Sequence, residues 1–158
     1  IDKKIIKYFY GWCLHAGFKG LVMVKRIFLV EDNDGDAMLI EEAFKALGHN
    51  IDFLERANNG EDAVERLAND NTPQPDLVLL DLNMPRMNGF EVLRHVRQVC
   101  ANKTLRIVVL STSDLVSDIR KALDLEANAY VTKATGFDAL MTQIDNIERF
   151  WLQTAKRA

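Results

Sequence analysis

Cysteine is scarce in this sequence, with two among 158 residues. Cys13 and Cys100 lie far apart and form no CxxC pair, so the chain lacks the regular cysteine spacing of a disulfide framework. We therefore predict that both residues are free thiols and that the protein is cytoplasmic.

The sequence also lacks an excess of charge of either sign, and it lacks long apolar runs. Its net charge is −3 at pH 7, which gives no reason to expect a nucleic-acid partner. No apolar run approaches the ~20 residues that a membrane-spanning helix needs, so no membrane partner is predicted. The hydrophobic share of 48% and the charged share of 27% are typical of a globular protein with a core.

A length of 158 residues is that of one ordinary domain. Residues 1–24 differ in composition from the rest of the chain. Aromatic residues are concentrated in the middle of this segment, and glycines interrupt it. A signal peptide and a membrane-surface segment are two interpretations of this stretch. The third, which we adopt, is an extension outside the domain, with Met23 directly before the first strand. We therefore predict a domain over 25–152 and a tail over 153–158.

The most informative stretch covers residues 75–89. Its four apolar residues 77–80 are too few for a helix and are typical of a strand buried on both faces of a parallel sheet. The run ends on the carboxylate of Asp81, and a loop with Pro85 follows. Ligands bind beyond the carboxyl ends of the strands in such sheets, so Asp81 lies where a functional residue is expected. Taken alone, it is equally consistent with a simple strand terminator.

The rest of the chain alternates short apolar runs with helical stripes. Leu39 and Ile40 both belong to the first stripe, which Gly48 ends as a C-cap, and Ser113 is the natural N-cap of the fourth helix. This alternation predicts an α/β fold with one five-stranded parallel sheet, doubly wound by helices on both faces. Strands are predicted at 26–30, 51–54, 77–80, 107–110 and 129–132, and helices at 37–47, about 63–67, 90–99, about 119–123 and 137–151.

Polar and charged residues follow four of the predicted strands. Glu31 and Asp32 follow the first strand, Asp81 the third, Ser111 the fourth and Lys133 the fifth. These strand ends share one edge of a parallel sheet, so three carboxylates converge there and repel one another. Mg²⁺ suits such carboxylates together with phosphate oxygens, and a lysine and a hydroxyl suit a phosphoryl group. We therefore predict a phosphoryl acceptor with a carboxylate nucleophile.

Each of these residues has a simpler interpretation when it is considered alone. Asp32 and Asp36 would belong to a solvated loop that caps a helix, and Ser111 would be a turn residue. Lys133 would be a surface lysine, and Tyr130 would be half-buried strand packing. Only the combination of these residues favours the phosphoryl site.

From about Lys25 to Trp151 the sequence resembles the receiver domain of response regulators in two-component signalling. Each matching motif is weak by itself, but their order and spacing together are specific. The resemblance implies a flavodoxin-like receiver fold and a signalling protein rather than an enzyme. The motifs are Leu29-Val30-Glu31-Asp32-Asn33, Ala57-Asn58-Asn59-Gly60-Glu61-Asp62-Ala63, Leu80-Asp81-Leu82-Asn83-Met84-Pro85, Asn88-Gly89, Leu110-Ser111-Thr112-Ser113 and Tyr130-Val131-Thr132-Lys133.

The resemblance implies a role for each residue of the acidic group. Asp81 would accept a phosphoryl group from a phospho-histidine of a sensor kinase. Mg²⁺ is the implied cofactor, with Asp32 and Asp81 as ligands and with Glu31 holding the ion through water. Asn83 would contribute its backbone carbonyl to the same ion.

The resemblance also implies the residues that hold the phosphoryl group and report its presence. Lys133 would pair with the group, Ser111 would hydrogen-bond it, and Tyr130 would move between outward and inward positions as the switch. One residue departs from the family pattern. Most receivers follow the lysine with a proline in a cis peptide, whereas this chain has Ala134. A cis bond before alanine costs ~3 kcal/mol, so a trans peptide is expected here.

Within the family, the sequence is similar to the small regulators that pair with bacterial phytochrome kinases, through its Asp-Leu-Asn-Met-Pro loop and its segment 147–152. A sensor histidine kinase resembling a phytochrome is therefore the expected partner. A stand-alone regulator is expected, because few residues follow Trp151. Phe150 and Trp151 are adjacent, and one helical stripe cannot easily bury both. We therefore expect a homodimer through the fifth strand and the last helix.

Two other classes of protein compete with a signalling switch. An aspartate-nucleophile phosphatase would carry a second Asp two residues after the nucleophile as its general acid, where this chain has Asn83. A flavodoxin-like binding protein would need a phosphate-cradling loop of Gly, Ser or Thr after the first strand. This chain has the acidic segment 31–34 there. Both observations favour the signalling switch.

Overall fold

The computed structural model describes residues 25–48, 51–100 and 102–152. The predicted extension 1–24 and tail 153–158 therefore lie outside the described residues, as do Cys13 and Met23. Within the described part, strands and helices alternate along the chain as predicted. In chain order the elements are β1 (Lys25–Val30), α2 (Asp34–Ala46), β2 (Ile51–Ala57), α3 (Gly60–Ala68), β3 (Leu77–Leu80), α4 (Gly89–Arg94), η1 (His95–Val99), β4 (Ile107–Ser111), α5 (Val116–Asp124), β5 (Ala129–Thr132) and α6 (Phe137–Trp151).

The strands form one five-stranded parallel sheet in the order β2-β1-β3-β4-β5. This confirms the predicted doubly wound α/β fold. β3 lies at the centre of the sheet and all four of its residues are buried. Val30 pairs with Leu80, so the residues that follow β1 and β3 emerge side by side at the same edge.

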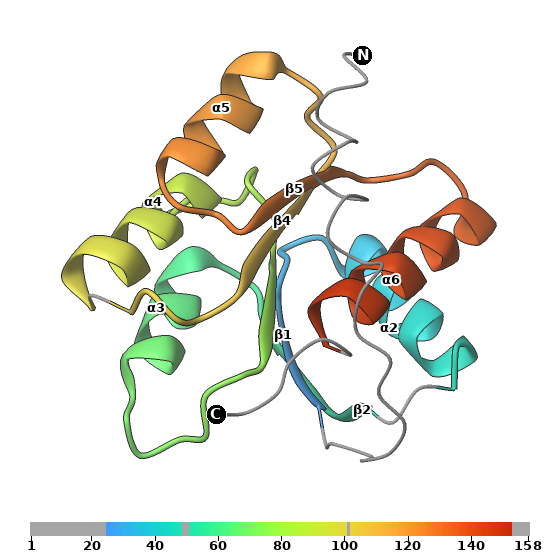
Figure 1. Ribbon diagram of the computed structural model, residues 1–158, viewed down its shortest axis with the longest axis horizontal. Coiled ribbons are helices and arrows are strands. Elements are labelled where there is room, and N and C mark those ends of the chain that lie inside the picture. Colours follow the sequence, from blue (N-terminus) through green and yellow to red (C-terminus); the bar gives the residue numbers. More distant parts are fainter. Residues whose placement is uncertain (1–24, 49–50, 101, 153–158) are drawn as a thin grey trace, which may run out of the picture.

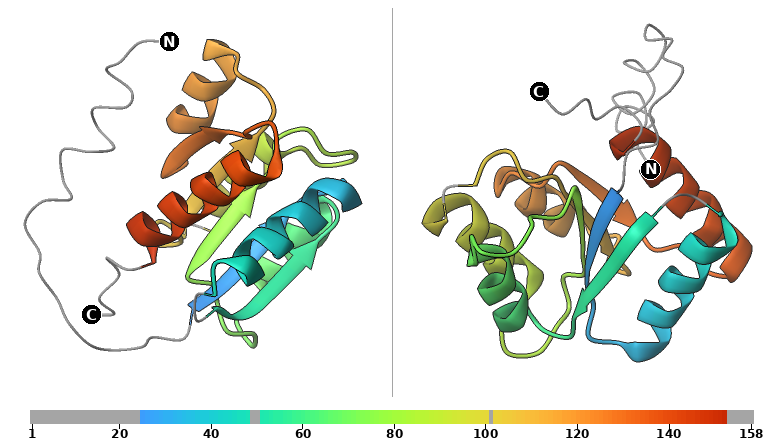
Figure 2. Two further views of the ribbon diagram at one scale, coloured as in Figure 1. Left: turned by 90° about the vertical axis from the view of Figure 1, so that its right-hand side faces the viewer. Right: turned by 90° about the horizontal axis from the view of Figure 1, so that it is seen from below.

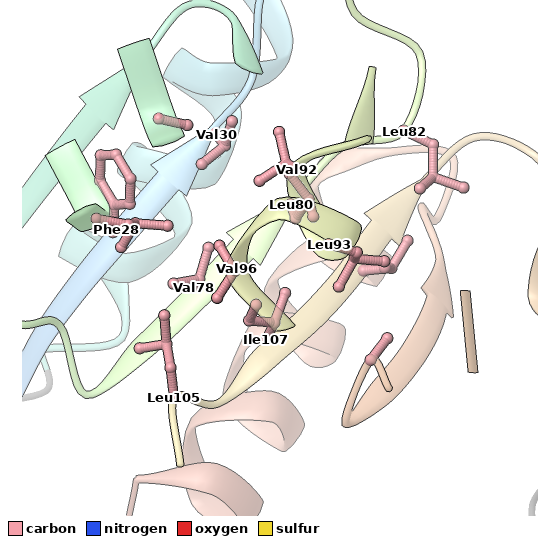
Figure 3. Packing of buried hydrophobic residues seen from close by; sticks show 14 of the residues in the cluster. Phe28, Val30, Val78, Leu80, Leu82, Val92, Leu93, Val96, Leu105 and Ile107 are labelled. Carbon is pink, nitrogen blue, oxygen red and sulfur yellow. The ribbon is translucent and has the colours of Figure 1, made fainter. Parts of the chain in front are cut away.

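Helices cover both faces of the sheet. In Figures 1 and 2, α3, α4 and α5 lie on one face, and α2 and α6 lie on the other. Successive residues of a strand point to opposite faces, so β1 and β3 each contribute to two separate cores. Figure 3 shows the first core, in which Phe28, Val30, Val78 and Leu80 pack beside Val92, Leu93 and Val96. The second core joins Ile27, Leu29, Leu77 and Leu79 to Ile40, Phe44 and Ile144.

Asparagine caps begin the three helices that follow β1, β2 and β3. The side chains of Asn33, Asn59 and Asn88 each accept a hydrogen bond from the backbone N–H three residues further on. Such caps satisfy N–H groups that have no partner inside the helix. Asn88 also forms a capping box with Glu91. The caps therefore fix where the loops at the carboxyl edge of the sheet end.

The prediction that Ser113 caps the fourth helix was wrong. Leu115 precedes α5 and provides no capping side chain. The Ser113 hydroxyl donates to Asp118 at 2.6 Å, and the Ser113 carbonyl accepts a hydrogen bond from the Tyr130 hydroxyl at 2.8 Å. These two bonds hold Ser113 in the loop after β4, so the helix begins further along the chain.

Other element boundaries also differ from the prediction. α2 begins at Asp34, because Asn33 caps it, and Leu39 on this helix is 42% exposed, while Ile40 is buried. β2 continues to Ala57, because it pairs with β1 over that length. The predicted helix over 90–99 is divided, since α4 is followed by a turn of π-helix, η1. Gly48 follows the end of α2 with a positive φ of 61°, which confirms its role in ending that helix.

The loop between β3 and α4 folds back against the end of β3. Leu82 and Met84 in this loop are buried, and the Gly89 N–H donates to the Leu82 carbonyl at 3.0 Å. A Cβ atom at position 89 would lie 2.3 Å from the backbone oxygen of Asp81. Glycine is therefore required where α4 begins, because any larger residue would displace the backbone of Asp81.

We expect Gly89→Ala to lower the free energy of unfolding by about 3 kcal/mol, because the added methyl group overlaps the Asp81 backbone. Gly48→Ala is the control without steric overlap, since no atom lies within 4 Å of its added Cβ. Gly48, unlike Gly89, has a positive φ. The control should lose about 1 kcal/mol from backbone strain. Urea unfolding measures both values, and equal losses would contradict a special constraint at position 89.

Candidate functional site

The candidate site lies at the carboxyl edge of the sheet, where β1, β3, β4 and β5 end. The Asp81 N–H donates to the Val30 carbonyl at 2.9 Å, and the Lys133 N–H donates to the Ser111 carbonyl at 2.8 Å. The backbone pairing of the strands thus continues one residue beyond β3 and β5. In an open parallel sheet this edge is the usual place for a ligand.

Three carboxylates meet at this edge. Glu31, Asp32 and Asp81 each offer an oxygen atom, and these atoms lie within 4.8 Å of one another. Glu31 and Asp81 are buried, with 2% and 5% of their surface exposed, and Asp32 is half-buried. The structure therefore brings together the acidic residues that the sequence predicted. Hard oxygen ligands at this separation are suited to a divalent cation such as Mg²⁺.

Lys133 supplies a positive charge beside this acidic group. Its Nζ lies 2.6 Å from Glu31 Oε2, 2.8 Å from Asp36 Oδ2 and 3.6 Å from Asp81 Oδ1. Burial alone would lower the pKa of Lys133. Its hydrogen bonds to Asp36 and Glu31 outweigh that effect and raise the pKa above the ordinary value. The ammonium therefore stays charged while it is largely shielded from water.

Glu31 is held at both of its carboxylate oxygens. Oε1 accepts a hydrogen bond from the Asn33 N–H at 3.1 Å, and Oε2 faces the Lys133 ammonium. Burial nevertheless raises the pKa of Glu31 above its ordinary value, because these hydrogen bonds do not fully compensate for lost hydration. The same loss of hydration makes a cation near Glu31 favourable.

Asp81 has one oxygen fixed and one directed toward Lys133. Its Oδ2 accepts a hydrogen bond from the Asn83 N–H at 3.0 Å, while Oδ1 is the oxygen 3.6 Å from Lys133 Nζ. This distance is longer than a hydrogen bond. The carboxylate is therefore oriented by the loop after β3, and the predicted metal contact of the Asn83 carbonyl stays a prediction.

Ser111 is the last residue of β4, and Tyr130 lies in the neighbouring strand β5. Ser111 is fully buried, and its hydroxyl oxygen lies 3.4 Å from the Ser113 N–H that donates to it. Tyr130 reaches over the same loop, and its hydroxyl donates to the Ser113 carbonyl. Burial raises the pKa of Tyr130, against hydrogen bonds with Ser111 and Ser113 that lower it. Both predicted switch residues therefore contact one loop.

Arg56, at the end of β2, supports the acidic loop from its other side, and sequence analysis missed it. Its Nε donates to the Glu31 carbonyl at 3.0 Å and its guanidinium also donates to the Asp32 carbonyl at 3.3 Å. The same group pairs with the exposed Asp34 at 2.8 Å. The available signal was a basic residue near the end of the strand beside β1. An arginine on the protein surface gives the same signal, so the sequence did not distinguish the two.

The loop that carries Lys133 is also fixed from α6. The Gln143 amide accepts a hydrogen bond from the Ala134 N–H at 2.8 Å and donates to the Thr132 carbonyl at 2.7 Å. No peptide bond in the described residues is cis, which agrees with the expected trans peptide before Ala134. Proline has no N–H, so it could not make the Ala134 hydrogen bond. Sequence analysis noted Ala134 but missed Gln143.

Residues 27–145 match the sequence profile of a family described as the response regulator receiver domain. Response regulator Rcp1 of Synechocystis sp. is 36% identical over 136 residues, which are 82% of this chain and 90% of that protein. No helix in the described residues is long and apolar enough to span a membrane.

Solved structures show the same likeness. The phosphorylated cyanobacterial phytochrome response regulator RcpA superposes with a TM-score of 0.77 at 38% identity, covering 85% of this chain and 98% of that chain. The Mn²⁺-bound form of the response regulator Rcp1 superposes with a TM-score of 0.74 at 36% identity, covering 85% of this chain and 99% of that chain. The RcpA structure is that of a phosphorylated protein, and the Rcp1 structure has Mn²⁺ bound.

Proposed function

This chain belongs to the response regulator receiver domain family, and we propose that Asp81 is the residue on which it accepts a phosphoryl group. Members of this family are signalling proteins rather than enzymes, and they are phosphorylated on an aspartate. The observation that supports Asp81 is its position: it is buried at the end of the central strand, within 4.8 Å of two other carboxylates and beside Lys133.

The proposed reaction is transfer of the group from a phospho-histidine. A carboxylate oxygen of Asp81 attacks the phosphorus atom, an O–P bond forms and the N–P bond breaks. The electron pair of that bond leaves on the imidazole nitrogen, which takes up a proton. Lys133 pairs with the phosphoryl oxygens, and Ser111 hydrogen-bonds one of them. The position of Lys133, whose Nζ lies 3.6 Å from Asp81 Oδ1, supports this arrangement.

We propose Mg²⁺ as the cofactor, because the acidic group fits its preferred ligands. Asp32 and Asp81 would bind the ion directly, Glu31 would hold it through water, and the Asn83 backbone carbonyl would complete the set. A bound ion would offset the negative charge of both the carboxylates and the phosphoryl oxygens. Burial raises the pKa of Glu31 although Lys133 pairs with it, so a further positive charge there would stabilise its charged form.

The proposed signal begins at Ser111 and ends at Tyr130. When Ser111 turns toward the phosphoryl group, its hydroxyl no longer accepts the hydrogen bond from the Ser113 N–H. Ser113 is also the residue that Tyr130 contacts. Tyr130 would then change between its outward and inward positions. The hydrogen bond from Tyr130 to the Ser113 carbonyl is the contact that couples the two residues in this proposal.

Membership of the family implies a cognate histidine kinase, and we propose a phytochrome-like one. The likeness to RcpA, a phytochrome response regulator, supports this choice. We further propose a cytoplasmic location, because such kinases draw their phosphoryl group from cytoplasmic ATP.

We propose that the domain spans residues 25–152. The matched range 27–145 supports these bounds, as do two contacts near the ends of the domain. Lys25 Nζ lies 2.9 Å from Glu148 Oε1, and Leu152 is buried in the second core. Segments 1–24 and 153–158 would then lie outside the domain.

Asp81→Asn should abolish phosphoryl labelling by acetyl phosphate, because an amide is not a nucleophile at this position. Radiolabelled acetyl phosphate with Mg²⁺ measures the label, and circular dichroism checks that the variant folds. Asp114→Asn is the matched control, because Asp114 is an exposed aspartate in the loop after β4. Label that persists in the Asp81 variant and is sensitive to hydroxylamine would refute the assignment.

Asp32→Asn should weaken Mg²⁺ binding by roughly tenfold or more, because it replaces a charged ligand of a hard cation. Asn83→Ala should change the affinity far less, since it keeps the backbone carbonyl. Isothermal titration calorimetry measures both affinities. Equal losses in the two variants would contradict the proposed ligand set.

We propose a homodimer through β5 and α6. β5 is an edge strand of the sheet, and Phe150 and Trp151 stack edge-to-face at 4.8 Å between ring centroids while both are only half-buried. Phe150→Glu should shift the wild-type mass measured by light scattering from dimer to monomer, because the charge would be buried in the interface. If the wild type is monomeric both with and without beryllofluoride as phosphoryl mimic, the proposed homodimer is refuted.

A further inference from the structure

We propose that Asp36 is a positioning residue for Lys133, which it holds while Asp81 is unmodified and for which it competes with the phosphoryl group. This inference rests on the proposed function of Asp81. It adds a residue that the receiver resemblance did not include, and that sequence analysis treated as part of a solvated loop.

The geometry of the Lys133 ammonium carries the inference. Its Nζ makes hydrogen bonds to Glu31 at 2.6 Å and to Asp36 at 2.8 Å, while the oxygen of Asp81 lies 3.6 Å away. The lysine side chain is 9% exposed, so water contributes little to its solvation. In the unmodified protein the ammonium is therefore bonded to two carboxylates other than the phosphoryl acceptor.

Asp36 differs from the other two carboxylates because it is not part of the acidic group. Glu31 and Asp81 both belong to the three residues whose oxygens lie within 4.8 Å of one another. A divalent cation bound there would compete with Lys133 for both of them. Asp36 is outside that set, so it remains available to Lys133 when the ion is present.

The position of Asp36 is fixed by the start of α2. Its N–H donates to the capping side chain of Asn33 at 3.0 Å, and this bond places the Asp36 side chain in the first helical turn beside Lys133. The bond uses the backbone of Asp36, so a substitution of the side chain leaves the cap intact. The carboxylate is 37% exposed, and Lys133 keeps its hydrogen bond to Glu31 when the charge of Asp36 is removed.

Lys133 must exchange this partner when Asp81 carries a phosphoryl group. Pairing with the phosphoryl oxygens requires Nζ to approach Asp81, and the bond to Asp36 is then stretched or lost. The free energy of the Asp36 pair therefore opposes phosphoryl binding. Removing the Asp36 carboxylate should release the lysine and strengthen that binding.

The test uses beryllofluoride as the phosphoryl mimic, titrated into the full chain with saturating Mg²⁺ and followed by ¹⁹F NMR. Asp36→Asn should tighten beryllofluoride binding roughly threefold to tenfold, the range set by a partly exposed ion pair. Asp36→Ser, which also lacks the carboxylate, should give the same direction of change. Asp36→Glu retains the charge and should restore an affinity close to that of the wild type.

Asp34→Asn is the matched control, because Asp34 is an exposed carboxylate in the same helical turn and pairs with Arg56 rather than with Lys133. Both Asn variants remove one negative charge near the site, so their Mg²⁺ affinities, measured by calorimetry, should fall by similar factors. Only Asp36→Asn and Asp36→Ser should bind beryllofluoride more tightly. An equal gain in Asp34→Asn would show a long-range charge effect and overturn the inference.

The outcomes separate this inference from the proposed function. If the wild type binds no beryllofluoride with Mg²⁺, the phosphoryl-acceptor function fails, and the role of Asp36 fails with it. If the wild type binds the mimic and Asp36→Asn binds it equally or more weakly, the proposed function stands and competition by Asp36 is refuted.

Discussion

The mutual repulsion of carboxylates at one edge of the sheet is the constraint on which the rest of the site depends. Glu31 and Asp81 are buried and face each other with Asp32 within 4.8 Å. Such a group is stable only if positive charge and hydrogen-bond donors surround it. Lys133 provides part of this compensation, and the N–H groups of Asn33 and Asn83 donate to Glu31 and Asp81. The remaining negative charge explains why the site suits a divalent cation.

The backbone, more than the side chains, determines where these charges lie. Glu31, Asp81 and Lys133 each come directly after a paired strand, so the parallel register of β1 and β3 sets the distance between Glu31 and Asp81. Asparagine caps then end the loops after β1 and β3. Gly89 also packs closely against the carbonyl of Asp81, which limits movement of the Asp81 backbone. The strand register and the helix caps together therefore fix the backbone positions of the acidic residues.

The loop that carries Lys133 shows how this chain departs from the pattern it resembles. The N–H of Ala134, which a proline would lack, bonds to Gln143 on α6. The NH₂ group of the same amide donates to the Thr132 carbonyl. The Gln143 side chain therefore bridges the residues on either side of Lys133. The position of Lys133 is therefore linked to α6 through Gln143, and to α2 through Asp36.

The sequence by itself determined the α/β alternation, the sheet edge and the convergence of Glu31, Asp81 and Lys133, because buried strands and the residues at their ends are local patterns. It did not determine the partners of Asp36 or the failure of Ser113 to cap α5. Those depend on which side chains from distant segments reach the same point: Lys133 is 97 positions from Asp36 along the chain. Local sequence encodes the elements and their ends, whereas contacts between loops arise only when the sheet has brought those ends together.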